Sequence, residues 1–244
     1  MSRRLWVPVA VAVALLLVAG GGAYVYFFSG LRTAPPALAL SSPSPSPTPS
    51  GTSTATPATG GAGTWTVASG SLAGYRVHEQ FAGQSASHEA VARTGEVSGQ
   101  VTITQTGDTY ELSAATITVQ LDNLASVDSV AGYNVTNRDR IVQRALDVGS
   151  FPTAVFTAQN VALPGAAAAG HTVTVSVPGK LNVHGVTKDV TAKLQLRVSA
   201  TGAQIAGTIS ASMTDFGVDP PTAPFVTVQP GLTIEVSLNL AKSA

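Results

Sequence analysis

The chain has 244 residues, of which 44% are hydrophobic and 11% are charged, and 13 basic residues balance 13 acidic ones. This zero net charge argues against a nucleic-acid partner, because such a partner requires basic surface to displace the counterions of its phosphates. Since the chain contains no cysteine, disulfide scaffolds, cysteine-ligated zinc, iron–sulfur clusters, thiol catalysis and cysteine-linked lipid anchors are all excluded.

An uncharged apolar run near the N-terminus predicts a membrane-spanning helix. The run covers Leu5–Phe28 and follows Arg3 and Arg4. At about 1.5 Å per residue it can cross a hydrocarbon core of about 30 Å. Two arginines before the run and one after it, Arg32, favour a cytoplasmic N-terminus. We therefore assign residues 1–32 to a cytoplasmic tip and a signal anchor.

A cleaved secretory signal peptide is the alternative for this segment. Its apolar core would be Leu5–Val18, with a small-residue cleavage site at Gly21-Gly22-Ala23. The apolar residues Tyr24–Phe28 that follow favour a retained, single-pass anchor. Both alternatives export the remainder of the chain, so we expect it outside the cytoplasmic membrane, in the periplasm or at the surface of a bacterial envelope.

Residues 33–63 predict a disordered linker. No charged residue occurs between Thr33 and Tyr75, and Ser41–Gly63 consists almost wholly of Ser, Pro, Thr, Gly and Ala. Such a composition cannot bury enough apolar surface to offset the entropy of ordering the chain. Its alternating Ser-Pro core favours extended polyproline II, so we expect a passive stalk.

From residue 64 to residue 244 the dominant pattern is the alternation of apolar and polar residues, which is typical of half-buried strands. Turn signals such as Pro164-Gly165, Thr201-Gly202 and Gln229-Pro230-Gly231 separate the alternating runs. We expect eight or nine strands with short connections, hence an antiparallel barrel or sandwich. The clearest alternating runs are Ile117-Val119-Leu121, Val173-Val175-Val177, Leu194-Leu196-Val198 and Leu232-Ile234-Val236-Leu238-Leu240.

One segment has helical spacing instead. Between Asn134 and Leu146 the apolar residues recur at intervals of three and four, after Asn134 or Thr136 as an N-cap. The domain is therefore predicted to be all-β with a single short helix, which could flank or plug one end of a barrel.

Three stretches together resemble the YceI-like polyisoprenoid-binding family. They are NRDRIVQRALDVGSFPTAVF at 137–156, GKLNVHGVTKDVT at 179–191, and MTDFGV at 213–218. The opening WTVASGSLAGYRVHEQF at 65–81 and the segment at 115–128 are similar to that family too. The resemblance covers nearly all of residues 64–244. One departure is Met213, since the family usually has arginine at that position.

This resemblance implies a lipocalin-like antiparallel barrel of about eight strands that encloses a long isoprenoid chain, with no established catalytic residues. A barrel of this size can hold one slender ligand. The alternative is that the same apolar residues pack a solid core. The residues that we expect to face the lumen are Phe81, Ile117, Val119, Leu121, Phe156, Leu181, Val183 and Phe216.

The candidates for binding a lipid head group are Arg140, Arg144 and His184. Arg140 and Arg144 are four residues apart and share a helix face, where they could receive a phosphate or a quinone. The alternatives are a solvated helix face and, for His184, a structural role in the turn before Val186.

Nothing in the sequence points to catalysis, a metal or another cofactor. His78-Glu79 and His88-Glu89 each begin like a zinc-protease motif, but alanine occupies the position of the second histidine in both, and the chain has no G-x-S-x-G elbow. We predict a non-enzymatic binder of a polyisoprenoid such as a quinone or polyprenyl lipid, with a homodimer left open. The alternative is an interaction module of the cell envelope with no ligand, and after it an enzyme acting near His184.

Overall fold

The computed structural model describes residues 32–41, 61–82, 87–130, 134–199, 202–223 and 225–243. The predicted anchor, Leu5–Phe28, lies outside these residues, as does the Ser/Pro tract at 42–60. Among the described segments, none is a helix with the length and hydropathy needed to traverse a bilayer.

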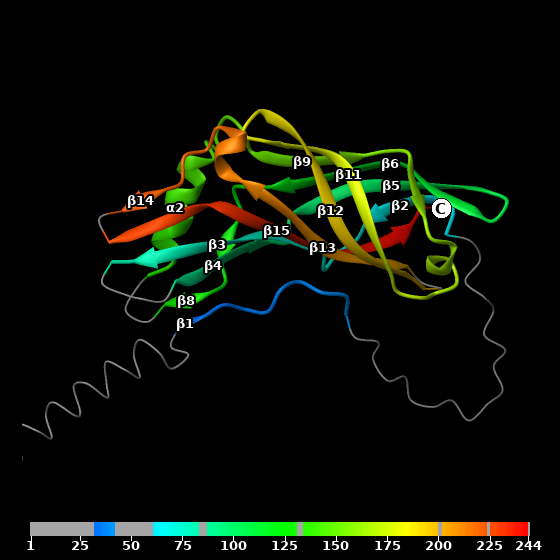
Figure 1. Ribbon diagram of the computed structural model, residues 1–244, viewed down its shortest axis with the longest axis horizontal. Coiled ribbons are helices and arrows are strands. Elements are labelled where there is room, and N and C mark those ends of the chain that lie inside the picture. The colour runs from blue at the N-terminus through cyan, green and yellow to red at the C-terminus, as the bar shows by residue number, and fades with distance from the viewer. Residues whose placement is uncertain are drawn as a thin grey trace, which may run out of the picture.

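Eight antiparallel strands close into a barrel, which confirms the predicted fold class (Figure 1). The strand order around it is β13-β12-β11-β9-β6-β5-β2-β15, and pairing of β15 with β13 closes the ring. β3 and β4 lengthen the wall, because β3 pairs with β15 beyond β2. The strands are β2 (Gly63–Val67), β3 (Leu72–Phe81), β4 (His88–Thr94), β5 (Val97–Thr106), β6 (Thr109–Gln120), β9 (Thr153–Ala158), β11 (Val173–Val183), β12 (Val186–Val198), β13 (Ala203–Ser212) and β15 (Val226–Lys242).

Short elements decorate this barrel. α2 (Thr136–Ala145) lies at one end of it, within the predicted 134–146 segment. The side-chain oxygen of Asn134 accepts a hydrogen bond of 3.0 Å from the backbone N–H of Thr136 at the start of this helix. The remaining elements are β1 (Arg32–Thr33), β7 (Ala125–Ser126), β8 (Ser129–Val130), β10 (Val161–Leu163), β14 (Thr222–Ala223) and the 3₁₀ turns η1 (Gly165–Ala167) and η2 (Met213–Phe216).

Alternation along the strands separates the inside of the barrel from the outside. In β11, Val175 and Val177 are buried and Thr174 and Ser176 are exposed, as expected where successive side chains point to opposite faces. The apolar set of each strand therefore faces inward.

The predicted turn at Gln229-Pro230-Gly231 is wrong. β15 runs through it, and its register against β3 shifts between Val228 and Leu232. A bulge accommodates proline and glycine within a strand, because the extra residues need no partner on that side. β15 can therefore reach along the whole wall.

Residues 32–41, hereafter the strap, lie along the outside of the barrel (Figure 1). β1 pairs with β8, and Ser41 accepts a hydrogen bond of 2.7 Å from Arg197 on β12. The sequence analysis places residues 33–41 in a disordered linker. The structure differs there, because arginine side chains of the barrel bind backbone carbonyls that a proline-rich segment leaves unpaired.

Candidate functional site

A cavity of about 280 Å³ occupies the interior of the barrel. Its wall reaches from Trp65, Leu163 and Val198 near one end to α2 and β14 at the other. Apart from the Glu79 and Arg138 side chains, the described residues of this wall carry no charge. The interior is thus an apolar tunnel with a polar site at one end.

The wall residues show that this interior is open rather than filled. Phe156, Leu194 and Ile205 belong to the core and line the cavity, yet each is only half-buried. Because their side chains line the cavity, the surface that they leave uncovered faces it. Close-packed interiors leave few voids larger than a water molecule, so an uncovered apolar wall of this kind is a feature of a binding cavity.

Seven of the eight predicted lumen residues line the cavity. They are Ile117, Val119, Leu121, Phe156, Leu181, Val183 and Phe216. Phe81 does not. It lies at the end of β3 and packs with Val130 and Val226 in a separate small cluster. Val226, the register partner of Phe81 on β15, does line the cavity, so the tunnel reaches the level of Phe81 while this side chain packs outside the wall.

The polar site at the end of the tunnel is a group of four buried side chains, hereafter the inner cluster: Arg138, Glu79, Asp128 and His88. Arg138 donates from Nη2 to Glu79 Oε2 at 2.9 Å and from Nη1 to Asp128 Oδ1 at 2.7 Å. His88 Nε2 lies 2.7 Å from Asp128 Oδ2. The exposed fractions of the four residues are 4–6%, so water screens none of these charges.

Burial and pairing act differently on the two carboxylates of the inner cluster. Burial raises the pKa of Glu79 above its ordinary value, and Arg138 offsets this only in part. Burial also acts to raise the pKa of Asp128, but hydrogen bonds from His88 and Arg138 outweigh it and hold that pKa below the ordinary value. Asp128 is therefore the firmly ionised partner of Arg138, and Glu79 is the more easily protonated one.

One donor of the inner cluster has no partner in the part of the chain that the structure describes. The Nε–H of Arg138 makes no hydrogen bond and is buried, although Arg138 lines the cavity. A buried guanidinium N–H without an acceptor is costly. An oxygen atom of a molecule in the tunnel would satisfy it. Burial also raises the pKa of the nearby Tyr75 phenol, which lines the same cavity.

The predicted head-group residues of α2 lie on a different face of the helix from Arg138. Arg140 and Arg144 are exposed, and neither belongs to the described cavity wall. Arg138 shares a helix face with Ile141, Val142 and Ala145, by the spacing i, i+3, i+4, i+7, and all four line the cavity. That spacing was available in the sequence, and it indicates an arginine on the apolar side of the helix.

His184 is not among the described residues that line the cavity. It and Gly185 form the turn between β11 and β12, both with positive φ, of 52° and 74°, as in the favoured two-residue hairpin loops. Its ring contacts the edge of Phe151 at 5.0 Å between centroids, and Nδ1 lies 3.3 Å from the carbonyl of Phe216. His184 thus holds η2, whose Met213 and Phe216 line the cavity.

In the described ranges, no group of three or more His, Asp or Glu side chains is arranged to hold a metal ion. The inner cluster supplies an arginine donor and two carboxylates, but its histidine is occupied by Asp128. The arrangement suits recognition of a polar group rather than metal coordination.

A closed eight-stranded barrel with an apolar lumen defines a lipocalin-like class of binding fold. The chain belongs to the family of YceI-like domains, whose family model matches residues 67–240. No curated protein gave a significant match.

Solved structures share this fold at low identity. A polyisoprenoid binding domain from Saccharophagus degradans, implicated in plant cell wall breakdown, is 16% identical, with a TM-score of 0.52 over 73% of this chain and 98% of that one. BcnA from Burkholderia cenocepacia is 16% identical, with a TM-score of 0.46 over 69% and 96%. The first of these likenesses supports the barrel.

Proposed function

We propose that this protein is a non-enzymatic binder of a polyisoprenoid or similar long apolar lipid, which it stores or transfers outside the cytoplasmic membrane. The observation that carries the proposal is the cavity of about 280 Å³, whose wall is apolar except at the inner cluster. The polyisoprenoid-binding domain that shares the fold supports the same class of ligand.

The energetics of the tunnel favour an apolar occupant. Each CH₂-sized group that leaves water for an apolar site gains about 0.8 kcal/mol, and no hydrogen bond is needed along the tail. Water in the tunnel would find few polar partners away from the inner cluster, and ordered internal water typically needs two to four. A hydrocarbon chain therefore fits the wall better than solvent does.

The inner cluster gives the ligand a direction. An acceptor oxygen of a quinone, a hydroxyl or a phosphate would satisfy the Nε–H of Arg138, while the tail extends along the barrel towards Trp65. A charge-assisted hydrogen bond of this kind is stronger than a neutral one. Tail burial would then supply most of the affinity, and Arg138 would select the head group.

The site of action that we propose is the outer side of the cytoplasmic membrane. It rests on the sequence of the run Leu5–Phe28 and on Arg3 and Arg4 before it, which lie outside the described residues. A single-pass anchor would keep the barrel beside the membrane in which long isoprenoids dissolve.

Native mass spectrometry of the full chain, purified from its own membranes, tests this function, and organic extraction identifies the retained lipid. We expect a one-to-one adduct with isoprenoid fragments. Ala192→Trp fills the lumen, since Ala192 is buried in the cavity wall, and should abolish the adduct. Ala114→Trp is the matched control, because Ala114 is exposed and outside that wall. A bare mass that quinones and polyprenyl phosphates leave unchanged would contradict the proposal and favour an interaction module.

A further inference from the structure

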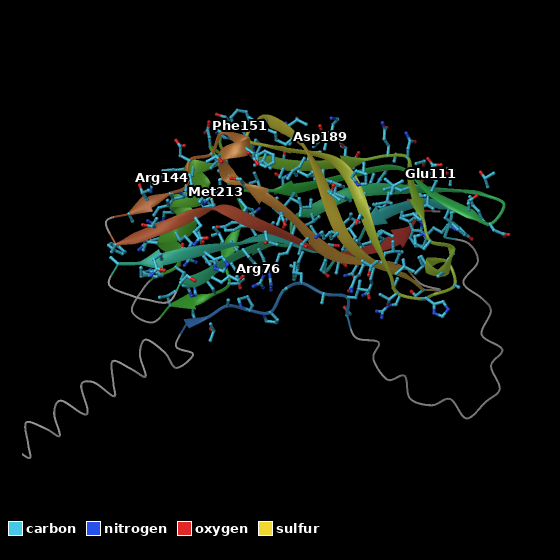
Figure 2. All side chains as sticks on the ribbon, viewed as in Figure 1. Arg76, Glu111, Arg144, Phe151, Asp189 and Met213 are labelled. Atoms are coloured by element: carbon cyan, nitrogen blue, oxygen red, sulfur yellow. The ribbon has the colours of Figure 1, made fainter. Side chains whose placement is uncertain are left out.

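The strap is fixed to the barrel by a second group of charges, hereafter the outer cluster: Glu235, Arg76 and Arg93. Arg76 Nε and Arg93 Nε donate to the two carboxylate oxygens of Glu235 at 2.8 and 2.7 Å. The backbone N–H of Leu38 in the strap donates to the same carboxylate at 3.1 Å. Glu235 is completely buried, so the strap closes over it. Figure 2 shows Arg76 where the strap crosses the sheet.

The two arginines also grip the strap backbone. Arg76 Nη2 donates to the carbonyl of Pro35 at 2.5 Å, and Arg93 Nη2 donates to the carbonyl of Pro36 at 2.6 Å. At the start of the strap, Thr33 Oγ1 lies 2.8 Å from Ser129 Oγ of β8. The strap is thus held at both ends and in the middle.

The strap begins at the end of the barrel formed by α2, β8 and β14, hereafter the α2 end (Figure 1). The predicted membrane run ends at Phe28, four residues before Arg32. Even a fully extended chain spans at most about 14 Å over four residues. A free linker over residues 33–63 would instead reach roughly 100 Å at about 3.1 Å per residue. Docking of the strap therefore replaces a long tether by a short one.

Two large apolar side chains are exposed at the α2 end. Val127 and Phe225 are the two large hydrophobic side chains that are exposed among the described residues, at 46% and 52%. Val127 precedes β8, and Phe225 precedes β15, where its carbonyl accepts a hydrogen bond of 2.9 Å from Ala82. Their neighbours Val130 and Val226 pack together. Both exposed side chains therefore lie at the end where the strap starts.

We propose that the strap holds the α2 end of the barrel against the lipid bilayer, with Val127 and Phe225 inserted at its surface. This inference rests on the membrane anchoring proposed above. Large apolar side chains on a short tether are placed to partition into the interface. Arg140 and Arg144, exposed on α2, would face the head groups. Figure 2 shows Arg144 at this end and Glu111 near the opposite one.

The orientation gives the tunnel a membrane-facing mouth. The cavity wall extends to Pro221, Thr222 and Ala223 at β14 and to Ile141 and Val142 on α2. A lipid would then pass between the bilayer and the lumen without crossing water.

Site-directed fluorescence tests the orientation, because the chain has no native cysteine. Val127→Cys, Phe225→Cys and Asp108→Cys each receive an environment-sensitive fluorophore in the full chain, reconstituted into phosphatidylcholine–phosphatidylglycerol nanodiscs. Asp108 is exposed on the β5–β6 hairpin at the far end. We expect a blue shift, and loss of emission with spin-labelled lipid, at 127 and 225 but not at 108. Equal quenching at all three positions, or none at 127 and 225, would overturn the proposal.

A strap variant tests the cause. Pro35→Gly, Pro36→Gly and Leu38→Pro together loosen the backbone and remove the N–H that binds Glu235. The quenching at 127 and 225 should then fall to the level at 108. The matched control carries Pro43→Gly, Pro45→Gly and Thr52→Pro, all outside the strap, and should behave as wild type. Unchanged quenching in the strap variant would overturn the role of the strap.

Native mass spectrometry of the same samples separates this inference from the proposed function. A lipid adduct without quenching at 127 and 225 overturns the orientation and leaves lipid binding intact. Quenching without any adduct supports the orientation and contradicts lipid binding.

Discussion

The outer and inner clusters both pair arginine with buried carboxylates, and both draw on β3. Arg76 and Glu79 lie three residues apart on that strand, so they point to opposite faces of the wall. In the outer cluster two arginines and a backbone N–H converge on the one carboxylate of Glu235. In the inner cluster one arginine serves two carboxylates and retains an unpaired donor.

This difference in pairing shifts the pKa values of the two glutamates in opposite directions. Burial acts to raise the pKa of Glu235, but hydrogen bonds from Arg93 and Arg76 hold it below the ordinary value. The same burial raises the pKa of Glu79, which shares its arginine with Asp128. A saturated cluster stabilises the fold, whereas an unsaturated one beside a cavity is available to a ligand.

Of the substitutions considered, removal of the Glu235 carboxylate should lower the free energy of unfolding most. Glu235→Ala leaves Arg93 without its carboxylate and Arg76 with only the half-buried Glu89, 2.6 Å from its Nη1, which should lower the free energy of unfolding by about 3 kcal/mol. Urea denaturation of residues 32–244 measures it. Glu111→Ala, at an exposed position on β6, is the control and should change stability by less than about 0.5 kcal/mol. Equal stability of Glu235→Ala and wild type would show that the cluster is dispensable.

The pH dependence of the outer cluster sharpens the comparison. Because folding lowers the pKa of Glu235, its contribution is present above the ordinary glutamate pKa and is lost as the pH falls through the folded-state value. Glu235→Gln should therefore be less stable than wild type by about 1.5–3 kcal/mol at neutral pH, and this difference should narrow in acid. Urea midpoints across a pH series measure it, and a constant difference would contradict the assignment.

Loss of Arg138 from the inner cluster should lower the free energy of unfolding less than loss of Glu235. Arg138→Met strands two carboxylates, but Glu79 can take up a proton and Asp128 keeps its bonds to His88 and to the backbone of Val91. We expect a loss of about 1–3 kcal/mol, smaller in mild acid than at neutral pH because Glu79 is then neutral. The variant should also lose its selectivity for the lipid head group, which native mass spectrometry with organic extraction measures. Arg140→Met is the control on the exposed face of α2, and an equal loss there would refute the distinction.

The smallest effect is expected at His184, the polar residue of the turn near η2. Asparagine also adopts positive φ, so His184→Asn should keep the turn and lose only the contacts with Phe151 and Phe216. The free energy of unfolding should fall by less than about 1 kcal/mol, with unchanged lipid binding by native mass spectrometry. His184→Val, which tolerates positive φ poorly, should be less stable than His184→Asn. Loss of the lipid in His184→Asn would instead make this residue a head-group ligand.

The barrel and its helix could be predicted from the sequence, because alternation and helical spacing are local patterns. The positions of Ile117 and Leu181 in the cavity wall follow from the same alternation. The place of Phe81 outside the cavity wall could not be predicted, since its register partner Val226 does line the cavity and no local pattern separates the two side chains. The inner cluster brings together Glu79, Asp128 and Arg138 from β3, a loop and α2, and no local pattern records that meeting.

The strap shows a different limit. Its composition is that of a disordered segment, and its contacts are made by four charged residues of the barrel, Arg76, Arg93, Arg197 and Glu235. A segment with unpaired carbonyls can be ordered by donors that lie far away in sequence. Composition alone therefore mistakes a docked segment for a free one.

The place of β15 in the chain bears on the order of assembly. This strand is the last of the barrel in sequence, yet it pairs with β2, β3 and β13 and carries Glu235. Neither ring closure nor docking of the strap can be completed before β15 is available for pairing. Until then the apolar wall stays open along one seam. Long-range pairings of this kind make folding slow, and the half-finished protein is the form that exposes apolar surface to aggregation.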